Sequence, residues 1–406
     1  MYLYYFIFYI KNLIINILFN KHIISMELSH SLPYYRKLLS SSLPIVQNIF
    51  PKKMISRYQL SKYLALPAIS SNIKVPGKVP INSFNRSILN PGWSMIERGG
   101  KQWRPLLGLI CSKIFINDLE NMKKHKGLYE LLYISDLVHN ASLIIDDIED
   151  KSIMRRGKKC VHLLYGEDVS INAGFSMMIF PMNYYLSQLN NKVVKGILAE
   201  NFLNELTSIH LGQGWDIEMK CNCLPEIQTY IDTVLCKTGV CPRLIIKMAK
   251  VYIEQILKIK TGLFFNEMLE LCDDLSVAFQ IWDDLMNLRP STVSKNKNKI
   301  GEDITEGKLT IMVLHSLKGN FANKERLKKI LTMGTKDQEL INEAIWIMKK
   351  NGSIKYSEMK KDQYVKLFEK KCNRIIKGKI DIPNKSNLNL KAMKALIELK
   401  NTLIKV

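Results

Sequence analysis

Apolar side chains recur every three or four positions along most of the chain after about residue 105, with lysine and glutamate between them. This spacing collects the apolar side chains on one face of a helix, whereas the alternation typical of β-strands and the dipeptides of β-hairpins are scarce. The pattern therefore predicts an all-α protein. The expected helices span residues 104–116, 126–149, 168–190, 193–213, 225–252, 262–287, 306–318, 324–332, 337–351, 356–374 and 389–404.

Two of these segments, "LYELLYISDLVHNASLIIDD" and "MLELCDDLSVAFQIWDD", have broad apolar surfaces and end in aspartates. Broad apolar surfaces are expected of helices that are surrounded by neighbours in a bundle. Residues 75–93 contain several proline and glycine breaks and predict a linker into the first core helix. We therefore expect a single helical bundle within residues 76–406.

The beginning of the chain differs in composition from the rest. Residues 1–96 hold eleven Lys or Arg and a single acid, Glu27. The first twenty residues are apolar and aromatic, but Lys11 and Asn12 interrupt them, so they do not predict a membrane span. A basic, serine-containing and acid-poor stretch is typical of a transit peptide. We expect residues 1–75 to be a poorly ordered leader that targets a plastid (apicoplast-like) or a mitochondrion.

Two alternatives remain for this segment: a folded amphipathic extension, or a surface anchor that gives a cytoplasmic protein a peripheral membrane contact. Part of the remaining net charge, +22 in total, comes from lysines scattered between asparagines, as in "VSKNKNK" at 293–299. Nucleic-acid grooves interleave basic with aromatic side chains, and this pattern is missing from the sequence. The sequence therefore argues against a nucleic-acid partner.

The first candidate site is the acidic run "DDIED". Asp146 and Asp150 lie four residues apart and share one helix face on consecutive turns, with Asp147 offset to the side. Two such carboxylates can clamp a hard divalent cation, and Mg²⁺ favours few protein oxygens together with the phosphates of a substrate. Taken alone, the run could equally be a solvated helix end.

A second run, "FQIWDDLMN", repeats this arrangement with Asp283 and Asp284, followed by Asn287 where a third acid would stand. The Asn287 carbonyl oxygen could still serve as a weaker ligand. Two clusters on separate bundle helices could face each other across a cavity and bind Mg²⁺. Further cations could compensate the charge of phosphates beside the metal. The candidates in "GGKQWRP", "MRRG" and "LCKTG" are Lys101, Arg104, Arg155, Arg156 and Lys237, with Thr238 beside the last.

These motifs, with "HLGQGWDI" and "GEDITEGKLT", follow one another in the order found in the trans-isoprenyl diphosphate synthase (polyprenyl synthase) family. Over residues 90–312 the chain resembles that family, and most of all its eukaryotic geranylgeranyl diphosphate synthases. The resemblance implies the isoprenoid synthase type I fold, a single helical bundle around a deep apolar cavity. It also implies a homodimer that uses Mg²⁺ to condense isopentenyl diphosphate with an allylic diphosphate.

The resemblance also implies roles for single residues. Isopentenyl diphosphate would be held by Lys101, Arg104, His139 and Arg156, and the allylic diphosphate by Arg155, Lys237 and Lys308. Two to three Mg²⁺ ions would be bound by Asp146, Asp147, Asp150, Asp283 and Asp284. Gln213, Asp216, Thr238 and Gln280 would line the site, and either Lys297 or Lys299 would add a further diphosphate contact.

Product length depends on the cavity below the first cluster. Ala141 and Ser142, about one turn before Asp146, are both small, whereas an aromatic residue there would stop growth at fifteen carbons. We expect a tunnel along residues 134–142 and a product of twenty carbons or more. Two other functions compete: a class I terpene cyclase, which has no use for "GGKQWRP", and a regulatory subunit of a heteromeric prenyl synthase, which usually lacks one aspartate cluster.

Overall fold

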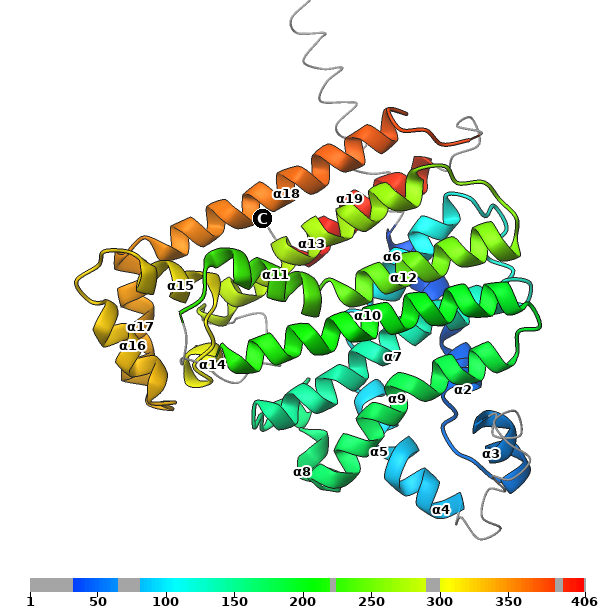
Figure 1. Ribbon diagram of the computed structural model, residues 1–406, viewed down its shortest axis with the longest axis horizontal. Helices are drawn as coiled ribbons and strands as arrows, with labels where there is room; N and C mark the ends of the chain where they lie inside the picture. The colour runs from blue at the N-terminus through cyan, green and yellow to red at the C-terminus, as the bar shows by residue number, and fades with distance from the viewer. Residues whose placement is uncertain (1–31, 65–80, 220–223, 290–299, 384–389, 405–406) are drawn as a thin grey trace, which may run out of the picture.

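The computed structural model describes residues 32–64, 81–219, 224–289, 300–383 and 390–404. Figure 1 shows long helices that lie side by side in one bundle, with short helices at its ends. Within the described ranges, strands occur only as the two-residue antiparallel pair β1 (Met154–Arg155) and β2 (Lys158–Lys159). The all-α prediction is confirmed. Among the described helices, none is both long and apolar enough to cross a membrane.

The bundle is built around long helices that contribute most of the buried apolar side chains of the core. The central helices are α6 (Trp103–Lys113), α7 (Lys126–Glu149), α9 (Glu167–Ser187), α10 (Lys192–Glu218), α12 (Val240–Val251), α13 (Phe264–Asn287) and α18 (Ser353–Ile376). The shorter helices are α8 (Val161–Tyr165), α11 (Ile227–Lys237), α14 (Glu302–Thr305), α15 (Ile311–Lys318), α16 (Lys324–Thr332), α17 (Gln338–Lys350) and α19 (Leu390–Leu403). Figure 1 places α14 to α17 at one end of the long helices.

The helix predicted over residues 225–252 is interrupted in the structure. It consists of α11 and α12, and between them the backbone N–H groups of Thr238 and Gly239 both donate to the Val234 carbonyl, at 2.8 and 3.0 Å. The Gly239 N–H bonds to the carbonyl five residues back, which is a wider turn than the regular i to i−4 series, so the regular helix is interrupted here. The break lies directly after Lys237, so it sets the direction of a predicted site residue.

The prediction of a poorly ordered leader up to residue 75 is wrong for residues 32–64. Residues 32–42 are helical, followed by a 3₁₀ turn (Leu43–Ile45), α2 (Val46–Ile49) and α3 (Arg57–Leu64). Ile49 and Phe50 are fully buried in the main core, and the hydroxyl of Tyr133 on α7 donates to the Leu39 carbonyl at 2.8 Å. The prediction relied on the basic composition of this segment and did not take into account its apolar side chains at helical spacing. Residues 1–31 and 65–80 lie outside the described residues, so targeting stays a prediction.

The predicted linker at 75–93 is helical from residue 81 onward. α4 (Ile81–Phe84), a π-helical turn (Asn85–Leu89) and α5 (Asn90–Ile96) follow one another. Pro91 lies in the first turn of α5, where its missing N–H is tolerated. Gly92 allows close packing, because a Cβ there would lie 2.8 Å from the Phe50 ring. Proline and glycine therefore mark a close approach here and not a flexible linker.

Candidate active site

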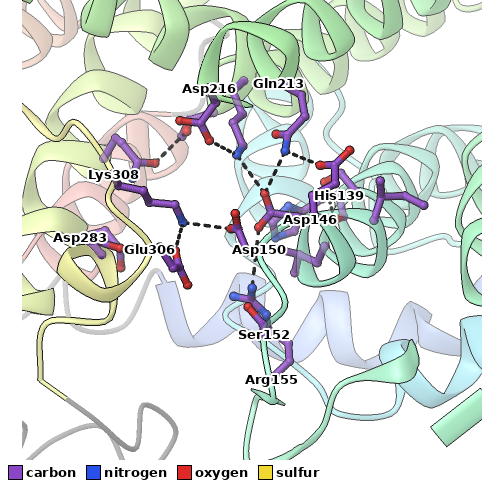
Figure 2. Close-up of a pocket in the computed structure, with 18 of the residues that line it drawn as sticks. His139, Asp146, Asp150, Ser152, Arg155, Gln213, Asp216, Asp283, Glu306 and Lys308 are labelled. Atoms are coloured by element: carbon purple, nitrogen blue, oxygen red, sulfur yellow. Dashed lines mark hydrogen bonds and ion pairs between the residues drawn. The ribbon is translucent and has the colours of Figure 1, made fainter. Parts of the chain in front are cut away.

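The aspartate-bearing ends of α7 and α13 face one cleft of about 1590 Å³. α10, the break after α11 and the loop after α14 complete its walls. Figure 2 shows Gln213 and Asp216 of α10 and Glu306 and Lys308 of the loop. Most of the site residues predicted by number line this cleft, whereas Ala141, Asp147 and Asn287 do not. The lining residues are Lys101, Arg104, His139, Ser142, Asp146, Asp150, Arg155, Arg156, Gln213, Lys237, Thr238, Gln280, Asp283, Asp284 and Lys308. Asp216 also lines the cleft, whereas Lys297 and Lys299 lie outside the described residues.

The first aspartate cluster is surrounded by cations. The Lys237 ammonium lies 2.9 Å from Asp146 and 2.7 Å from Asp216, so it joins α7 to α10. Lys308 lies 3.1 Å from Asp150 and 2.6 Å from Glu306. Burial raises the pKa of Asp146, but Lys237 and Lys308 outweigh burial and lower that pKa to about 2. The Asp146 carboxylate is therefore firmly ionised.

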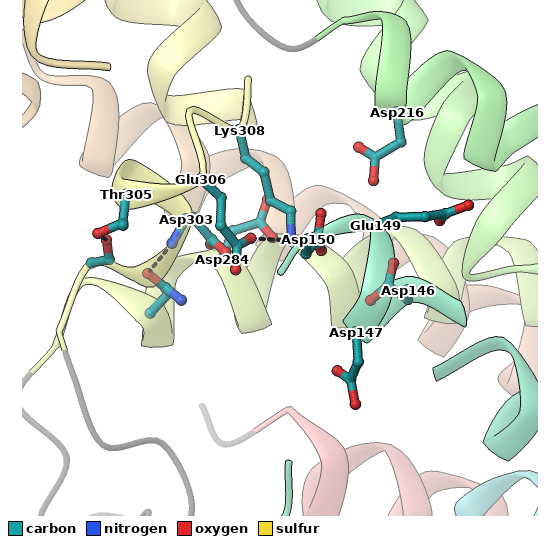
Figure 3. A network of polar contacts seen from close by, with 12 residues as sticks. Asp146, Asp147, Glu149, Asp150, Asp216, Asp284, Asp303, Thr305, Glu306 and Lys308 are labelled. Carbon is teal, nitrogen blue, oxygen red and sulfur yellow. Dashed lines mark hydrogen bonds and ion pairs between the residues drawn. The ribbon is translucent and has the colours of Figure 1, made fainter. Parts of the chain in front are cut away.

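Asp147 has a different role from its neighbours. Its side chain is fully buried, and its Oδ1 accepts from Arg155, with contacts of 2.7 Å to Nε and 2.5 Å to Nη2. Figure 3 shows the Asp147 carboxylate pointing away from those of Asp150 and Asp216. Asp147 therefore does not reach the cleft as a metal ligand would. It orients Arg155, which does line the cleft.

The second cluster is built from acids and neutral hydrogen-bond donors. The buried Asp284 carboxylate accepts from the Tyr230 hydroxyl at 2.7 Å and from the Gln280 amide at 2.9 Å. The Gln280 oxygen accepts in turn from the Thr238 hydroxyl at 2.8 Å. Burial, and after it the carboxylate of Asp303, raises the pKa of Asp284 to about 7. This half of the cleft brings several acids close together, and burial disfavours the charged form of Asp284.

Asn287, whose side-chain oxygen could have served as a weaker ligand, does not line the cleft. It is buried, and its Oδ1 accepts from the backbone N–H of Asp303 at 3.2 Å. Its own carbonyl accepts from the Gly301 N–H at 2.9 Å. Asn287 therefore anchors the loop before α14 and brings Asp303 beside Asp284.

The side of the cleft near α6 is rich in cations. The Arg104 guanidinium lies 4.7 Å from the Trp103 ring centre and is buried, and the Lys101 ammonium lies 4.8 Å from the Trp282 ring centre. Arg156 donates to the Asn140 side-chain oxygen at 2.8 Å. Burial and the nearby arginines hold the pKa of His139 well below its usual value, so His139 is neutral. This wall suits a diphosphate, because its arginines offer charged donors.

The two predicted chain-length residues differ in position. Ser142 lies in the wall of the cleft, together with Phe175 and Met178 of α9. Ala141 is fully buried in the contact with α9, where a Cβ added at Gly174 would lie 3.5 Å from its carbonyl oxygen. The structure therefore directs the predicted tunnel along Ser142 and α9, and away from Ala141.

The donor set of the cleft fits a hard divalent cation. Asp146 and Asp150 on one side, and Asp283 and Asp284 on the other, present carboxylate oxygens, which are the ligands that Mg²⁺ prefers. The raised pKa of Asp284 shows that burial and nearby carboxylates disfavour its charged form, which a bound cation would stabilise. No three His, Cys, Asp or Glu side chains of the described residues converge to hold a metal by themselves. The two clusters would share ions only with a ligand between them.

Several residues of the cleft were missed by the sequence reasoning. Glu149 stands within "DDIED", and its carboxylate accepts from the Gln213 amide at 2.5 Å. Tyr230 precedes Lys237 by seven residues, a spacing of two helical turns that places both on one face of α11. That spacing was available as a signal. The other missed residues are Asp136, Asn140, Asp303 and Glu306.

A helical bundle with two aspartate clusters facing a cation-lined cleft defines a prenyltransferase of the isoprenoid synthase class. The family model described as polyprenyl synthetase matches residues 85–348, and the chain belongs to this family. It is 30% identical over 290 residues to the geranylgeranyl pyrophosphate synthase of Dictyostelium discoideum, covering 71% of this chain and 88% of that protein. With the geranylgeranyl pyrophosphate synthase of Aspergillus flavus it shares 34% identity over 55% of this chain and 62% of the relative.

Solved structures agree on the fold. The geranylgeranyl pyrophosphate synthetase of Pyrococcus horikoshii superposes with a TM-score of 0.67 at 21% identity, covering 92% of this chain and 98% of that one. The polyprenyl synthase of Caulobacter crescentus, solved with calcium and isoprenyl diphosphate, gives 0.67 at 16% identity, covering 93% and 98%. At these identities the likeness shows a shared fold, which is the expected bundle.

Proposed function

We propose that this prenyltransferase uses Mg²⁺ to condense isopentenyl diphosphate with an allylic diphosphate into an all-trans polyprenyl diphosphate of twenty carbons or more. The observation that carries the proposal is the pair of aspartate-bearing helix ends, α7 and α13, which face each other across one cleft. The cleft has cationic groups on both sides of the acids. Two diphosphates and their metal ions need this alternation of charge, because like charges at close range repel.

Different residues of the cleft would bind the two substrates. Lys101, Arg104 and Arg156 lie together on one wall, where they would bind the diphosphate of isopentenyl diphosphate. Neutral His139 would donate a hydrogen bond there without adding charge. Arg155, Lys237 and Lys308 lie beside the first cluster, where they would bind the allylic diphosphate. Bound Mg²⁺ would stabilise the negative charge that develops on the leaving group.

The reaction balances without a dedicated protein base. The allylic carbon–oxygen bond breaks, the alkene of isopentenyl diphosphate forms the new carbon–carbon bond, and the released diphosphate takes the proton. The Thr238 hydroxyl and the Gln280 amide are hydrogen-bonded to each other at 2.8 Å in the cleft wall, where their oxygens would lie near the developing cation. Asp216 and Gln213 hold the opposite edge of the first cluster. Apolar lining such as Met178 and Ile209 would keep water away from the cation.

A homodimer is proposed as the assembly. Ile171, Phe175 and Ile179 follow one another at intervals of four on α9 and are 40%, 42% and 50% exposed. Leu163 and Leu164 of the adjacent α8 are about half exposed as well. A second copy covering this surface would remove a contiguous apolar patch from water. Light scattering of the wild type and of Ile179→Glu tests this, and an unchanged mass in the variant would contradict it.

Delivery to a plastid or mitochondrion is proposed from the basic, acid-poor composition at the beginning of the chain. A fluorescent protein fused behind residues 1–31 tests it, because an organellar signal is expected. A diffuse cytoplasmic signal would favour the cytoplasmic alternative, and a signal on membranes would favour a peripheral membrane contact.

The central experiment is chromatography of the products that the purified chain makes from isopentenyl diphosphate and each allylic primer, with Mg²⁺ present. We expect alcohols of twenty carbons or more after phosphatase treatment. A chain that consumes the allylic diphosphate without isopentenyl diphosphate would be a terpene cyclase. A chain that turns over neither substrate, yet activates a partner, would be a regulatory subunit.

A further inference from the structure

Arg243 of α12 joins three helices behind the cleft. One of its terminal nitrogens, Nη1, donates to the Leu235 carbonyl on α11 at 2.9 Å and to Asp273 on α13 at 2.7 Å. Its Nη2 donates to Glu205 on α10 at 3.1 Å. The Arg243 side chain is 16% exposed and does not line the cleft. It therefore has no direct access to a substrate.

We propose that Arg243 is a positioning residue for the groups that bind the allylic diphosphate. The inference rests on the proposed function and assigns this arginine a role in the affinity of one substrate. It acts through the break between α11 and α12, from which Lys237 and Thr238 extend into the cleft. Its effect should be confined to this half of the site.

Arg243 caps the C-terminal end of α11. The last carbonyl groups of a helix lack partners within the helix and are bound by capping groups. Leu235 lies two residues before Lys237, and its carbonyl is capped by the Arg243 guanidinium. Since α10 and α13 hold that guanidinium from two sides, the end of α11 is fixed relative to both. The position of the Lys237 backbone is therefore fixed relative to α10 and α13.

Arg243 and α10 both pack closely against the break between α11 and α12. A Cβ at Gly239 would lie 2.6 Å from both Arg243 Nη1 and the Leu235 oxygen. A Cβ at Gly212 of α10 would lie 2.9 Å from the Lys237 backbone nitrogen. Two glycines thus allow the break to be clamped between α10 and the guanidinium. Lys237 can then hold Asp146 and Asp216 together, at 2.9 and 2.7 Å.

Arg243 also forms an ion pair with a buried carboxylate, that of Glu205. The Glu205 side chain is only 4% exposed and meets both Arg243 and Lys247, the latter at 2.7 Å. A buried carboxylate between two cations is stable only while they remain in place. Lys247 reaches the same carboxylate from one turn further along α12, away from the break. It offers a matched control, because its removal disturbs Glu205 while Arg243 still caps Leu235.

The test compares Arg243→Met with Lys247→Met in the full chain. For Arg243→Met we expect the KM of the allylic diphosphate to rise at least tenfold, while the KM of isopentenyl diphosphate stays within twofold of wild type. Lys247→Met should leave both within twofold. Equal changes in the two variants, or equal rises for the two substrates, would overturn the inference, because a merely structural role predicts them.

Two further measurements keep the test decisive. If Arg243→Met fails to fold, Arg243→Lys replaces it: an ammonium cannot bind Leu235, Asp273 and Glu205 together, so the allylic KM should still rise at least threefold. Calorimetry with inorganic diphosphate and Mg²⁺ measures the same half-site without turnover. Wild-type diphosphate binding without prenyl transfer would refute the proposed function alone. Equal diphosphate affinity in Arg243→Met and Lys247→Met would refute the positioning role alone.

Discussion

The two aspartate clusters are alike in sequence, but the pKa of one aspartate in each, Asp146 and Asp284, is shifted in opposite directions. Each follows an apolar helix and begins with adjacent aspartates. In the first, Lys237 and Lys308 lower the pKa of Asp146 to about 2 in spite of burial. In the second, burial and the nearby Asp303 raise the pKa of Asp284 to about 7. The neighbours that cause this difference come from other elements: the break after α11 for Lys237, and the loop around α14 for Asp303.

The walls beside the clusters differ as well. Four residues before Asp146 stands Ser142, a small side chain in the cleft. Four residues before Asp283 stands Phe279, whose ring centre lies 5.7 Å from that of Trp103. If the proposed function holds, a growing apolar chain would find more room beside Ser142 than beside Phe279. One local motif therefore has different neighbours in the two halves of one site: a small side chain and two lysines near the first cluster, and aromatic side chains and a further acid near the second.

The largest expected effect concerns metal removal. A chelator should abolish product formation, and added Mg²⁺ should restore it, because burial and neighbouring carboxylates disfavour the charged form of Asp284 unless a cation is bound. The measurement is product formed from radiolabelled isopentenyl diphosphate. Full turnover in chelator would show that the two clusters do not act through a metal.

Next in size is the loss of a single aspartate from either half. Asp146→Ala and Asp283→Ala should each lower kcat by several orders of magnitude, since each removes a transition-state contact of about 3 to 5 kcal/mol. Asp362→Ala, on the surface of α18, is the control and should retain wild-type kcat. If one cluster tolerated the change, the reaction would need only the other half.

The length of the product tests whether the growing chain passes Ser142 in the wall of the cleft. Ser142→Phe should shift the products toward fifteen carbons, because an aromatic ring would fill space beside the first cluster that the chain must enter. Ala141→Phe should instead lower the melting temperature, because overpacking a buried contact typically costs about 1 to 3 kcal/mol. Chromatography of the dephosphorylated products and a thermal melt distinguish these outcomes. Unchanged products from a folded, active Ser142→Phe variant would mean that the chain leaves by another route.

The smallest effect is the pH dependence of stability without metal. The folded pKa of Asp284, about 7, lies above the ordinary value of 3.8, so between these values the folded state binds a proton that the unfolded chain has released. Its contribution to stability therefore falls as pH rises through this window. Asp284→Asn should raise the melting temperature by a few degrees at pH 7.5 and by less at pH 5.

Asp146→Asn should have the opposite sign. Its folded pKa of about 2 lies below 3.8, so its contribution is present above pH 4 and is lost as pH falls toward 2. The substitution should lower the melting temperature at pH 7.5, because it leaves Lys237 with one carboxylate fewer. Melts of both variants in chelator check this, and equal signs would refute the contrast between the clusters.

The sequence predicted what depends on local spacing. α7 and α13, and the aspartates at their ends, follow from helical periodicity within single segments. The role of Asp147 did not follow, because its partner Arg155 is brought there by the turn after α7. The contact between Asn287 and Asp303 depends on how the chain returns to α13 after residue 287. The sequence alone does not contain this path, so it suggested a ligand role for Asn287. The break at Thr238 and Gly239 depends on packing against α10, which periodicity along one helix does not contain.

The packing of residues 32–64 limits how this chain could be matured. A processing protease that cut near residue 75 would remove Ile49 and Phe50 and uncover the face of α5 at Gly92. It would also remove the Pro51 carbonyl, to which the Trp93 indole donates at 2.9 Å. The exposed apolar surface would invite chaperone binding and aggregation. If the beginning of this chain is removed, a cleavage before Leu32 would leave these contacts intact.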